Sequence, residues 1–384
     1  MSVMSKIQRH LRIDLKGAPA VFLWGPRKTG KTTLLRTQFP QAKLYDLLKT
    51  DLKTTLLLHP ERLREEVLGQ KPKIVIIDEV QKVPALLDEV HWCLENTKTK
   101  FILCGSSARK VRHGSANLLG GRAWRFELFP LTTSEIKNID LNRALNHGVL
   151  PKHYLEKHPE RSLKSYILDY INEEIHAEAL VRNIPAFSNF LEMVALGHGQ
   201  LINYATMGRD CGVDGKTVRE YYQILEDTLL GHTLEPWRKT KKRRLIETAK
   251  FYLFDVGIVR ALKGMHIIQP GTVEFGHSFE HFLIEEIRAY LSYKEKMVPL
   301  AFWKTSTGLE VDLIVGQLEL ALEFKATSRI RKEDLKGLLA LNEEHHIKQS
   351  IIVCLSEETR KLENNILVLP WKVFCQKLWN DELI

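Results

Sequence analysis

The segment Gly25-Pro-Arg-Lys-Thr-Gly-Lys-Thr32 has the residue types and spacing of a loop that binds phosphate groups. It fits the pattern G-x-x-x-x-G-K-[ST], follows the apolar run Val21–Trp24 and opens a predicted helix, Thr32–Thr37. In such a loop the backbone N–H groups and the helix N-terminus face the phosphates. Lys31 would then reach the β- and γ-phosphates, and the Thr32 hydroxyl would coordinate Mg²⁺. An ordinary glycine-rich turn is the alternative, and the flanking strand and helix count against it.

Two further strand ends carry polar residues that suit the same chemistry. The run Ile74–Ile77 predicts a strand buried on both faces, and Asp78 and Glu79 follow at its carboxyl end, where ligands gather in parallel sheets. We expect Asp78 to support the Mg²⁺ ion and Glu79 to polarise the attacking water. The strand Phe101–Cys104 leads to Ser106, which would contact the γ-phosphate or the water; a simple strand-terminating turn is the alternative.

An arginine that stabilises charge in the transition state is also expected in such a site. Arg122 is the candidate for an arginine finger or a sensor within the same subunit, and Arg109, Arg112 and Arg125 compete with it. For each of them the alternative is a solvated loop arginine.

The stretch 201–230 has the pattern of a helix-turn-helix. Gly212 provides the turn, Val213 is expected as a buried hinge residue, and Asp214 is expected to cap the second helix. Thr217 and Arg219 then stand near the front of that helix, where a recognition helix makes its contacts.

The next segment, Trp237–Lys250, holds seven basic residues against Glu247 alone, which favours a wing that binds nucleic-acid phosphates. A solvated hairpin on a purely structural winged helix is the alternative, and Glu220 and Glu226 on the second helix make sequence-specific readout doubtful. The predicted DNA contacts are Lys216, Thr217, Arg219, Lys241, Lys242, Arg243 and Arg244.

A second set of charged residues lies on a predicted hairpin, Glu310–Lys325. Gly316-Gln317 suits a two-residue type II′ turn, which would place Asp312 opposite Ala321. Asp312, Glu323 and Lys325 then lie on one face, and the other face, which must be the core, carries Val311, Leu313, Val315, Leu318, Leu320, Leu322 and Phe324. Asp312 and Glu323 would be diagonal neighbours within reach of one cation.

This layout matches D…(D/E)-x-K, in which carboxylates hold Mg²⁺ and a lysine lies near the attacking water. Glu280, in the predicted helix Ser278–Leu291, would supply a further acidic ligand. The alternative is a set of ordinary charged residues on the open face of a hairpin.

The elements that must position these residues fall into three regions. Strands alternate with helices up to about Ser134, which predicts a parallel sheet. The pattern is then helical to Leu230, with Ser162–Ala179 and Phe187–Leu196 as examples. Mixed structure returns after the basic segment, ending with a helix at Lys332–Asn342 and a strand at Ser350–Leu355.

Composition limits the class of protein. The chain has 384 residues, 44% hydrophobic and 27% charged, which is ordinary globular usage and predicts two or three domains. No apolar run approaches the ~20 residues of a membrane-spanning helix, and we expect no secretory signal. Five scattered cysteines predict reduced thiols and a cytoplasmic location. The net charge of +9 permits a polyanionic partner without requiring one.

Taken together, the chain resembles the prokaryotic AAA-type ATPases whose C-terminal domain of unknown function combines a winged helix with a restriction-endonuclease-like fold. The resemblance covers nearly the full length. It rests on the loop Gly25–Thr33 and on IIDEVQKVPALLDEVH, GSSARK, GRAWRFELFPLTTSEI, KFYLFDVGI, FEHFLIEEI, FWKTSTGLEVDLIV and LEFKAT, besides the helix-turn-helix.

The resemblance implies an α/β protein with four parts. They are an AAA-type ATPase core over residues 1–134, a helical lid or connector over 135–187, a winged helix-turn-helix over 188–262 and a PD-(D/E)xK nuclease-like domain over 263–384. It implies Glu280, Asp312, Glu323 and Lys325 as nuclease site residues. It also implies ATP binding by Gly25, Pro26, Arg27, Lys28, Thr29, Gly30, Lys31, Thr32 and Thr33.

Three functions remain open at this point. The first is an ATP-driven enzyme that holds DNA on the winged helix and cleaves it with Mg²⁺. The second is a nucleotide-dependent DNA-binding switch with a non-catalytic nuclease-like fold. The third is an ATPase that remodels a protein, or a defence or toxin-linked module. If Arg122 acts across a subunit boundary, the active form is a homo-oligomeric ring, a hexamer by resemblance to AAA-type proteins.

Overall fold

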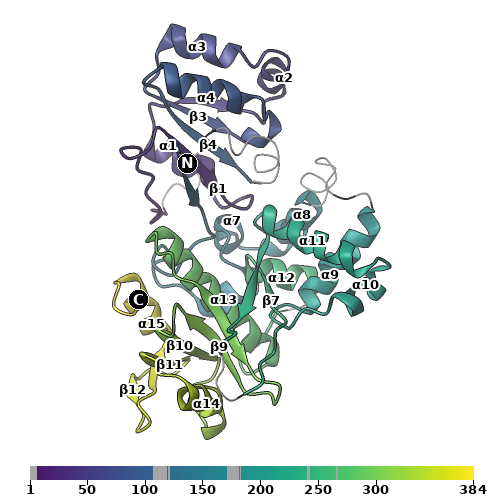
Figure 1. Ribbon diagram of the computed structural model, residues 1–384, viewed down its shortest axis with the longest axis vertical. Helices are drawn as coiled ribbons and strands as arrows, with labels where there is room; N and C mark the ends of the chain where they lie inside the picture. Colours follow the sequence, from purple (N-terminus) through teal and green to yellow (C-terminus); the bar gives the residue numbers. More distant parts are fainter. Residues whose placement is uncertain are drawn as a thin grey trace. The chain divides into compact units, whose positions relative to one another are not determined.

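The computed structural model describes residues 7–106, 119, 122–170, 181, 183–239, 243–264 and 267–384 (Figure 1). The chain divides into two compact units. The first comprises residues 1–131 with 227–230, and the second comprises residues 132–226 with 231–384. Each unit has its own sheet, so we describe them separately.

A five-stranded parallel sheet forms the centre of the first unit, which confirms the predicted parallel α/β arrangement. The strand order is β2-β3-β4-β1-β5. The strands are β1 (Ala20–Trp24), β2 (Lys43–Asp46), β3 (Ile74–Asp78), β4 (Lys100–Gly105) and β5 (Ala123–Glu127). The helices between them are α1 (Lys31–Gln38), α2 (Thr50–Leu58), α3 (Arg62–Gln70) and α4 (Leu86–Asn96).

Residues that alternate along the strands form the core on one face of this sheet. Val75, Ile77, Phe101 and Leu103 pack there with buried residues of α2, α3 and α4. The intervening residues Val21, Leu23, Ile76, Ile102 and Cys104 are buried as well. A sheet buried on both faces explains why its strands read as continuous apolar runs.

The second unit contains a group of helices, most of them in its first part. They are α6 (Leu141–His147), α7 (Pro151–Leu155), α8 (Pro159–Tyr170), α9 (Ile184–Leu196) and α12 (Val256–Leu262). The predicted helix Ser162–Ala179 therefore begins earlier, at Pro159, and its residues 171–179 lie outside the described ones.

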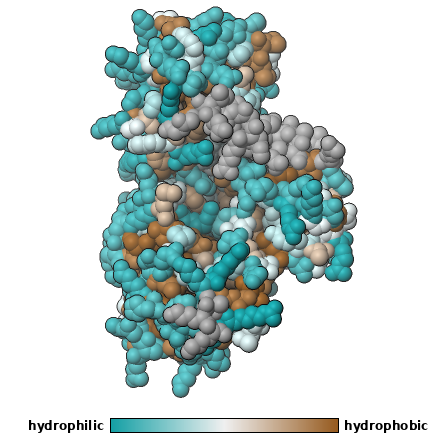
Figure 2. Space-filling model, viewed as in Figure 1, coloured by the Kyte–Doolittle hydropathy of each residue, from teal (hydrophilic) through white to brown (hydrophobic). Residues whose placement is uncertain are grey.

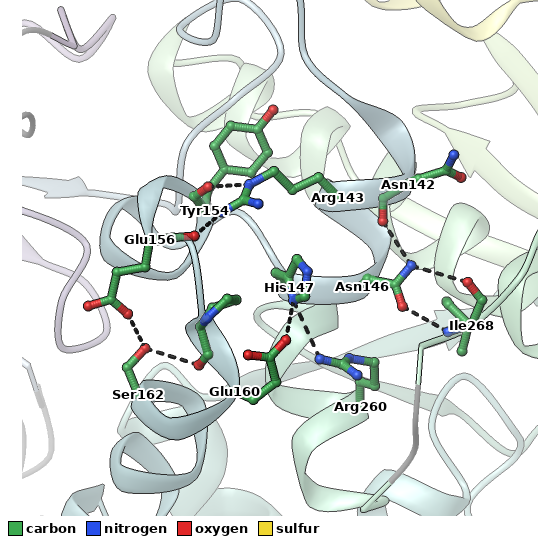
Figure 3. Close-up of polar contacts among 11 residues, drawn as sticks. Asn142, Arg143, Asn146, His147, Tyr154, Glu156, Glu160, Ser162, Arg260 and Ile268 are labelled. Atoms are coloured by element: carbon green, nitrogen blue, oxygen red, sulfur yellow. Dashed lines mark hydrogen bonds and ion pairs between the residues drawn. The ribbon is translucent and has the colours of Figure 1, made fainter.

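Polar side chains join these helices (Figure 3). Arg143 donates to the carbonyl oxygens of Tyr154 and Glu156, and so holds α6 against the end of α7. Asn146 exchanges two hydrogen bonds with the backbone of Ile268, at 2.8 and 3.2 Å. These contacts satisfy backbone groups at the C-terminal end of α7 and in the segment that contains Ile268.

The predicted helix-turn-helix is present as α10 (Tyr204–Cys211) and α11 (Gly215–Asp227). Gly212 ends α10 with φ of 68°, a left-handed conformation that glycine adopts readily. Asp214 accepts a hydrogen bond from Thr217 N at 2.7 Å, which confirms the predicted cap. Val213 is half-buried, so its prediction as a buried hinge residue was too strong.

Eight strands form the sheet of the second unit, in the order β12-β13-β11-β10-β9-β8-β6-β7. Strands β6 and β7 pair antiparallel with each other, and β6 also pairs parallel with β8. The predicted winged-helix segment and the predicted C-terminal domain thus contribute strands to one sheet, across the predicted boundary at residue 262. The strands are β6 (Gly231–Pro236), β7 (Lys250–Leu253), β8 (Leu300–Lys304), β9 (Glu310–Val315), β10 (Leu320–Lys325), β11 (Gln349–Cys354), β12 (Arg360–Lys361) and β13 (Leu367–Pro370).

Three helices flank this sheet. They are α13 (Val273–Tyr293), α14 (Lys336–Glu344) and α15 (Trp371–Trp379). Helix α13 begins five residues before the predicted start at Ser278, because Thr272 caps it by accepting a hydrogen bond from Phe275 N. It packs against β10, and α14 packs against β9.

The hairpin of β9 and β10 differs in register from the prediction. Leu320 pairs with Val315 and Leu322 with Leu313, so the turn comprises four residues, Gly316–Glu319, in place of two. Leu318 lies in this turn with φ of 74° and does not belong to the strand. Strand β9 is irregular between Val311 and Ile314, but Asp312 still lies beside Glu323, because its Oδ2 accepts a hydrogen bond from the next residue of β10, Phe324. The face of β10 that carries Glu323 is not open, because Ala321 and Ile352 on that face pack in a core cluster with Leu338 and Leu341 of α14.

No helix within the described residues is long and apolar enough to cross a membrane. The face shown in Figure 2 is hydrophilic over most of its area, with hydrophobic residues visible in places. Leu57 and Leu58 on α2 are among the exposed ones. All five cysteines are free and buried, as predicted.

Candidate functional site

The phosphate loop links β1 to α1 at the carboxyl end of the parallel sheet. Two glycines are required by its shape. A Cβ atom on Gly25 would lie 2.5 Å from the Leu128 carbonyl oxygen, and Gly30 has φ of 97°. The Thr29 hydroxyl donates to Pro26 O at 2.9 Å across the loop. Arg9, which the sequence did not single out, supports the loop by donating to Thr29 O at 2.7 Å and to Phe129 O at 2.7 Å.

The two charged residues expected to meet phosphate and metal lie beside the loop. Lys31 is buried, and its Nζ donates to Gly25 O at 2.7 Å and Pro26 O at 3.0 Å. The Thr32 hydroxyl donates to Asp78 Oδ2 at 2.7 Å. Strand β3 ends at Asp78, and β1 and β3 both pair in register with β4, so these ends share one edge of the sheet. The structure therefore brings Lys31, Thr32 and Asp78 together.

Glu79 and Ser106 also meet, through a residue that the sequence analysis missed. Gln81 is buried and donates from Nε2 to Glu79 Oε2 at 2.6 Å and to Ser106 Oγ at 3.2 Å. Ser106 Oγ in turn donates to Glu79 Oε2 at 3.3 Å. A Cβ atom on Gly105 would lie 2.3 Å from Gln81 Oε1, so the fit around this amide is close. The only sequence signal was a polar residue two positions after Glu79.

Arg122 lies elsewhere. It precedes Ala123, which pairs with Ala20 at the amino end of β1, so it sits at the sheet edge opposite the phosphate loop. Its Nη1 donates to Glu95 Oε1 at 2.8 Å. The expectation of a sensor within the same subunit is therefore wrong, and a role across a subunit boundary stays a prediction. Arg109 and Arg112 lie outside the described residues.

The second candidate site lies in the sheet of the second unit. Asp312 on β9 and Glu323 on β10 are both buried, and Lys325 donates to Glu323 Oε1 at 2.6 Å. Asp312 Oδ2 accepts a hydrogen bond from Phe324 N at 2.8 Å, which fixes its carboxylate against β10. Glu280 on α13 acts electrostatically on both carboxylates. The four residues predicted from sequence therefore form one cluster.

Strand β7 contributes two residues to this cluster that were not predicted for it. Lys250 Nζ lies 2.7 Å from Glu310 Oε1 and 3.6 Å from Glu280 Oε1. The Tyr252 hydroxyl donates to Glu280 Oε1 at 2.6 Å. Lys250 had been counted among the basic residues of the wing. The sequence held one signal for this. Lys250 and Tyr252 are two positions apart in an otherwise apolar strand, so their side chains lie on the same face of the sheet.

Burial and mutual repulsion govern the charges of the cluster. Burial, together with the Glu323 and Glu280 carboxylates, raises the pKa of Asp312 well above its usual range. Burial also raises the pKa of Glu323, although Lys325 opposes the shift. Burial acts to lower the pKa of Lys250, but Glu280, Glu310 and Asp312 outweigh it and raise that pKa. The carboxylates of the cluster therefore carry more negative charge than the neighbouring lysines neutralise.

A divalent cation would neutralise the remaining negative charge, and one observation bears on where it could bind. Glu323 Oε2 is buried and finds no hydrogen-bond partner among the described residues, which is costly for a carboxylate oxygen. In the described part of the chain no group of three or more His, Cys, Asp or Glu side chains is placed to hold a metal ion as it stands. Glu323 and Asp312 would therefore be the first ligands, and Glu280 would have to move to join them.

The predicted DNA contacts are placed unevenly. Lys216, Arg219 and Arg244 are exposed, and Thr217 is half-buried. Arg243 is not available as predicted, because it donates to Glu344 at 2.6 Å, to Glu343 and to Ala340 O at 2.9 Å on α14. Lys241 and Lys242 lie outside the described residues.

Comparison with protein families divides the chain into three matches. Residues 17–137 match an AAA domain, residues 138–267 match a domain of unknown function (DUF8612), and residues 275–374 match another (DUF4143). The AAA match spans the five-stranded sheet and the phosphate loop. The chain thus carries an AAA ATPase domain followed by two domains of unknown function.

Individual proteins resemble the chain at lower identity. An uncharacterized protein of Mycobacterium tuberculosis is 29% identical over 316 residues, covering 79% of this chain and 69% of that protein. Another, from Methanocaldococcus jannaschii, is 23% identical and covers 96% of this chain and 86% of that protein. The Walker-type ATPase PABY2304 of Pyrococcus abyssi matches with a TM-score of 0.44 and 17% identity, over 65% of this chain and 92% of that one. A score this low carries no argument about function.

Proposed function

We propose that the chain binds ATP with Mg²⁺ at Gly25–Thr33 and hydrolyses it. The observation that carries this proposal is the Thr32 hydroxyl on Asp78 Oδ2 at 2.7 Å, directly beside the buried Lys31. A hydroxyl and a carboxylate in contact at the end of a phosphate loop are the oxygen ligands that Mg²⁺ takes in nucleotide sites. The ion, when bound, neutralises charge on the β- and γ-phosphates.

The chain's own residues divide the remaining work. Lys31 leaves the carbonyl oxygens of Gly25 and Pro26 to meet phosphate, because a phosphate oxygen is a stronger acceptor for an ammonium group. The Glu79 carboxylate orients and polarises the attacking water, and the Ser106 hydroxyl beside it contacts the water or the γ-phosphate.

The test is phosphate release and nucleotide binding by three proteins. We expect Lys31→Ala to lose both activities, since it removes the phosphate contact. Glu79→Gln should keep ATP binding and lose hydrolysis, because an amide cannot polarise the water as a carboxylate does. Hydrolysis by Lys31→Ala at the wild-type rate would refute the assignment.

A second activity is favoured by the buried, unpartnered Glu323 Oε2. We infer that Asp312 and Glu323, with Glu280, hold Mg²⁺ or Mn²⁺ and that the site cleaves phosphodiester bonds of DNA. The cation, when bound, acts as a Lewis acid on the phosphate. The Lys325 ammonium group pairs with the other carboxylate oxygen of Glu323, Oε1. Because the Lys325 side chain is 29% exposed, this group can hold a water beside the scissile phosphate.

DNA would reach the chain through α11. Lys216 and Arg219 are exposed there, and the Arg219 guanidinium lies 4.8 Å from the centre of the Tyr204 ring, which steadies it. Phosphate contacts make binding fall steeply with salt. We expect the double substitution Lys216→Gln with Arg219→Gln to weaken binding and reduce the slope of log K against log salt by about 1 to 2.

The nuclease proposal is tested with supercoiled plasmid and single-stranded circles in Mg²⁺ or Mn²⁺, with and without ATP. Glu323→Gln should abolish cleavage, whereas Glu333→Gln, an exposed carboxylate elsewhere in the unit, should not. Absence of cleavage, with ATP hydrolysis still stimulated by DNA, would favour a DNA-binding switch. Absence of DNA binding as well would favour a protein-remodelling ATPase.

A homo-oligomeric ring is the further expectation for the ATPase. Arg122 could complete a neighbouring site only from another copy of the chain, because in its own subunit it lies at the far edge of the sheet. Specific ATPase activity should then rise with protein concentration and fall in Arg122→Gln. A fully active monomer would exclude this role.

A further inference from the structure

Lys250 is the least exposed cation of the carboxylate cluster in the second unit. Its side chain is 5% exposed, compared with 26% for Lys304 and 29% for Lys325. It starts β7, the outer strand of the wing hairpin, and its Nζ contacts Glu310 and Glu280. Its Nζ also lies 5.1 Å from the centre of the Phe302 ring. Such a lysine cannot act as a surface contact for DNA.

Without an added ion, the carboxylates of the cluster outnumber its ammonium groups by one. Glu280, Glu310, Asp312 and Glu323 bring four carboxylates, and Lys250, Lys304 and Lys325 bring three ammonium groups. Among the described residues, Lys304 forms its ion pair with Glu310, and Lys325 pairs with Glu323. Lys250 is thus the cation that faces Glu280, the carboxylate that a metal ion would have to recruit.

Tyr252 fixes the same carboxylate from the same strand. Its hydroxyl donates to Glu280 Oε1, the oxygen that Lys250 also approaches. The ring is held in turn by buried histidines: His198 packs edge-on to it and His232 stacks on it, with ring centres 5.3 and 5.7 Å away. Glu280 is therefore kept in its present position by two groups of β7.

We propose that Lys250 is the internal counter-ion of the C-terminal carboxylate site and competes with a divalent cation for Glu280 and Glu310. The inference rests on the proposed cation site of Asp312 and Glu323. In the metal-free protein the ammonium group of Lys250 stabilises the buried carboxylates. It also repels an entering cation and withholds Glu280 from it, so removing its charge tightens cation binding.

The test measures Mn²⁺ binding and thermal stability of the full chain, without nucleotide or DNA. All variants carry Asp78→Asn, so that the phosphate loop does not contribute a second Mn²⁺ site. Free Mn²⁺ is counted by electron paramagnetic resonance, and Tm is measured with and without Mn²⁺. Neither readout depends on cleavage.

Lys250→Met keeps the apolar stem and removes the charge, and Lys250→Gln keeps a donor for Glu310 in case the methionine variant does not fold. We expect either variant to bind Mn²⁺ at least about tenfold more tightly than the parent, because a like charge close to the ion is lost. Without Mn²⁺ its Tm should fall, because buried carboxylates lose their partner. Mn²⁺ should then raise Tm more than in the parent.

Two matched controls separate charge from general damage. Lys250→Arg keeps the charge and should not tighten binding. Lys304→Met removes a more exposed cation, which pairs with Glu310, and should tighten binding less than Lys250→Met.

The outcomes distinguish this inference from the function on which it rests. If the parent binds Mn²⁺ and Glu323→Gln abolishes it, but Lys250→Met and Lys250→Gln bind equally or more weakly, Lys250 is not a competing counter-ion and the inference is overturned alone. If the parent binds no Mn²⁺, or if Glu323→Gln binds as the parent does, the proposed cation site fails and the inference fails with it.

Discussion

Glu286 offers the clearest test of how the helix that carries Glu280 is held. It lies on α13, is buried, and its Oε1 accepts hydrogen bonds from Thr133 N at 2.9 Å, from the Thr133 hydroxyl and from Trp379 Nε1 at 2.6 Å. It therefore joins α13 to the start of the unit and to α15. Burial raises the pKa of Glu286 to about 7, with a further contribution from Glu135, while the Thr133 and Trp379 bonds oppose the rise.

The sign of the pH dependence follows from this shift. The native pKa lies above the ordinary value of 4.5, so the protonated form is favoured by folding. The stability contribution is complete below pH 4.5 and is lost as the pH rises through about 7. A difference of about 2.5 pKa units corresponds to about 3 kcal/mol of lost stability by pH 8.

Glu286→Gln should remove this loss. Three of the hydrogen bonds use Oε1, so a glutamine can keep them through its amide oxygen and resembles the protonated acid. It loses only the longer contact of Thr133 N with Oε2, at 3.1 Å. We expect the variant to match wild type near pH 4.5 and to be more stable by about 3 kcal/mol at pH 8.

Urea unfolding followed by tryptophan fluorescence at a series of pH values gives the difference between the two proteins. Glu192→Gln, at an exposed position on α9, is the matched control and should show no difference. A wild-type protein that is equal to or more stable than Glu286→Gln at pH 8 would refute the reasoning.

Three other substitutions have defined outcomes. Gln81→Leu should reduce ATP turnover by about tenfold to a hundredfold with nucleotide affinity unchanged, because Glu79 loses the donor that positions it; unchanged turnover would contradict this. Gly148→Ala should destabilise the second unit by ~3 kcal/mol in thermal unfolding, because its Cβ would lie 1.9 Å from Asp255 Oδ1. Gly264→Ala is the control: its φ is also positive but the space around it is open, so it should cost only ~1 kcal/mol. Arg243→Gln should lower stability, because the buried Glu344 loses its ion pair with Arg243. It should not change the salt dependence of DNA binding. A reduced slope of log K against log salt would restore Arg243 as a DNA contact.

The phosphate loop was predictable because its function is encoded in consecutive residues. Gly25, Lys31 and Thr32 fix a local conformation, and the strand pattern around Asp78 places it at the same sheet edge. The partners that complete this site were not predictable. Arg9 and Gln81 act through contacts that depend on the tertiary fold, and no local pattern marks them.

The C-terminal site shows a different limit. The strand pattern correctly placed Asp312 and Glu323 on neighbouring strands of one hairpin, although the predicted turn was wrong and β9 contains a bulge. Whether the face that carries Glu323 is open depends on the helix that packs over it, α14, which local sequence does not specify. For the same reason the charge of Lys250 and Arg243 suggested a surface wing, while the structure pairs both with carboxylates of the C-terminal sheet and α14.

The central claim is that one chain contains two separate phosphate-reacting sites, and parallel assays on the same preparations test it most directly. ATP hydrolysis and plasmid cleavage are measured for wild type, Lys31→Ala and Glu323→Gln in Mg²⁺ or Mn²⁺. The account predicts that Glu323→Gln hydrolyses ATP at the wild-type rate and does not cleave, and that Lys31→Ala does not hydrolyse ATP. Cleavage that survives Glu323→Gln, or loss of both activities in that variant, would contradict it.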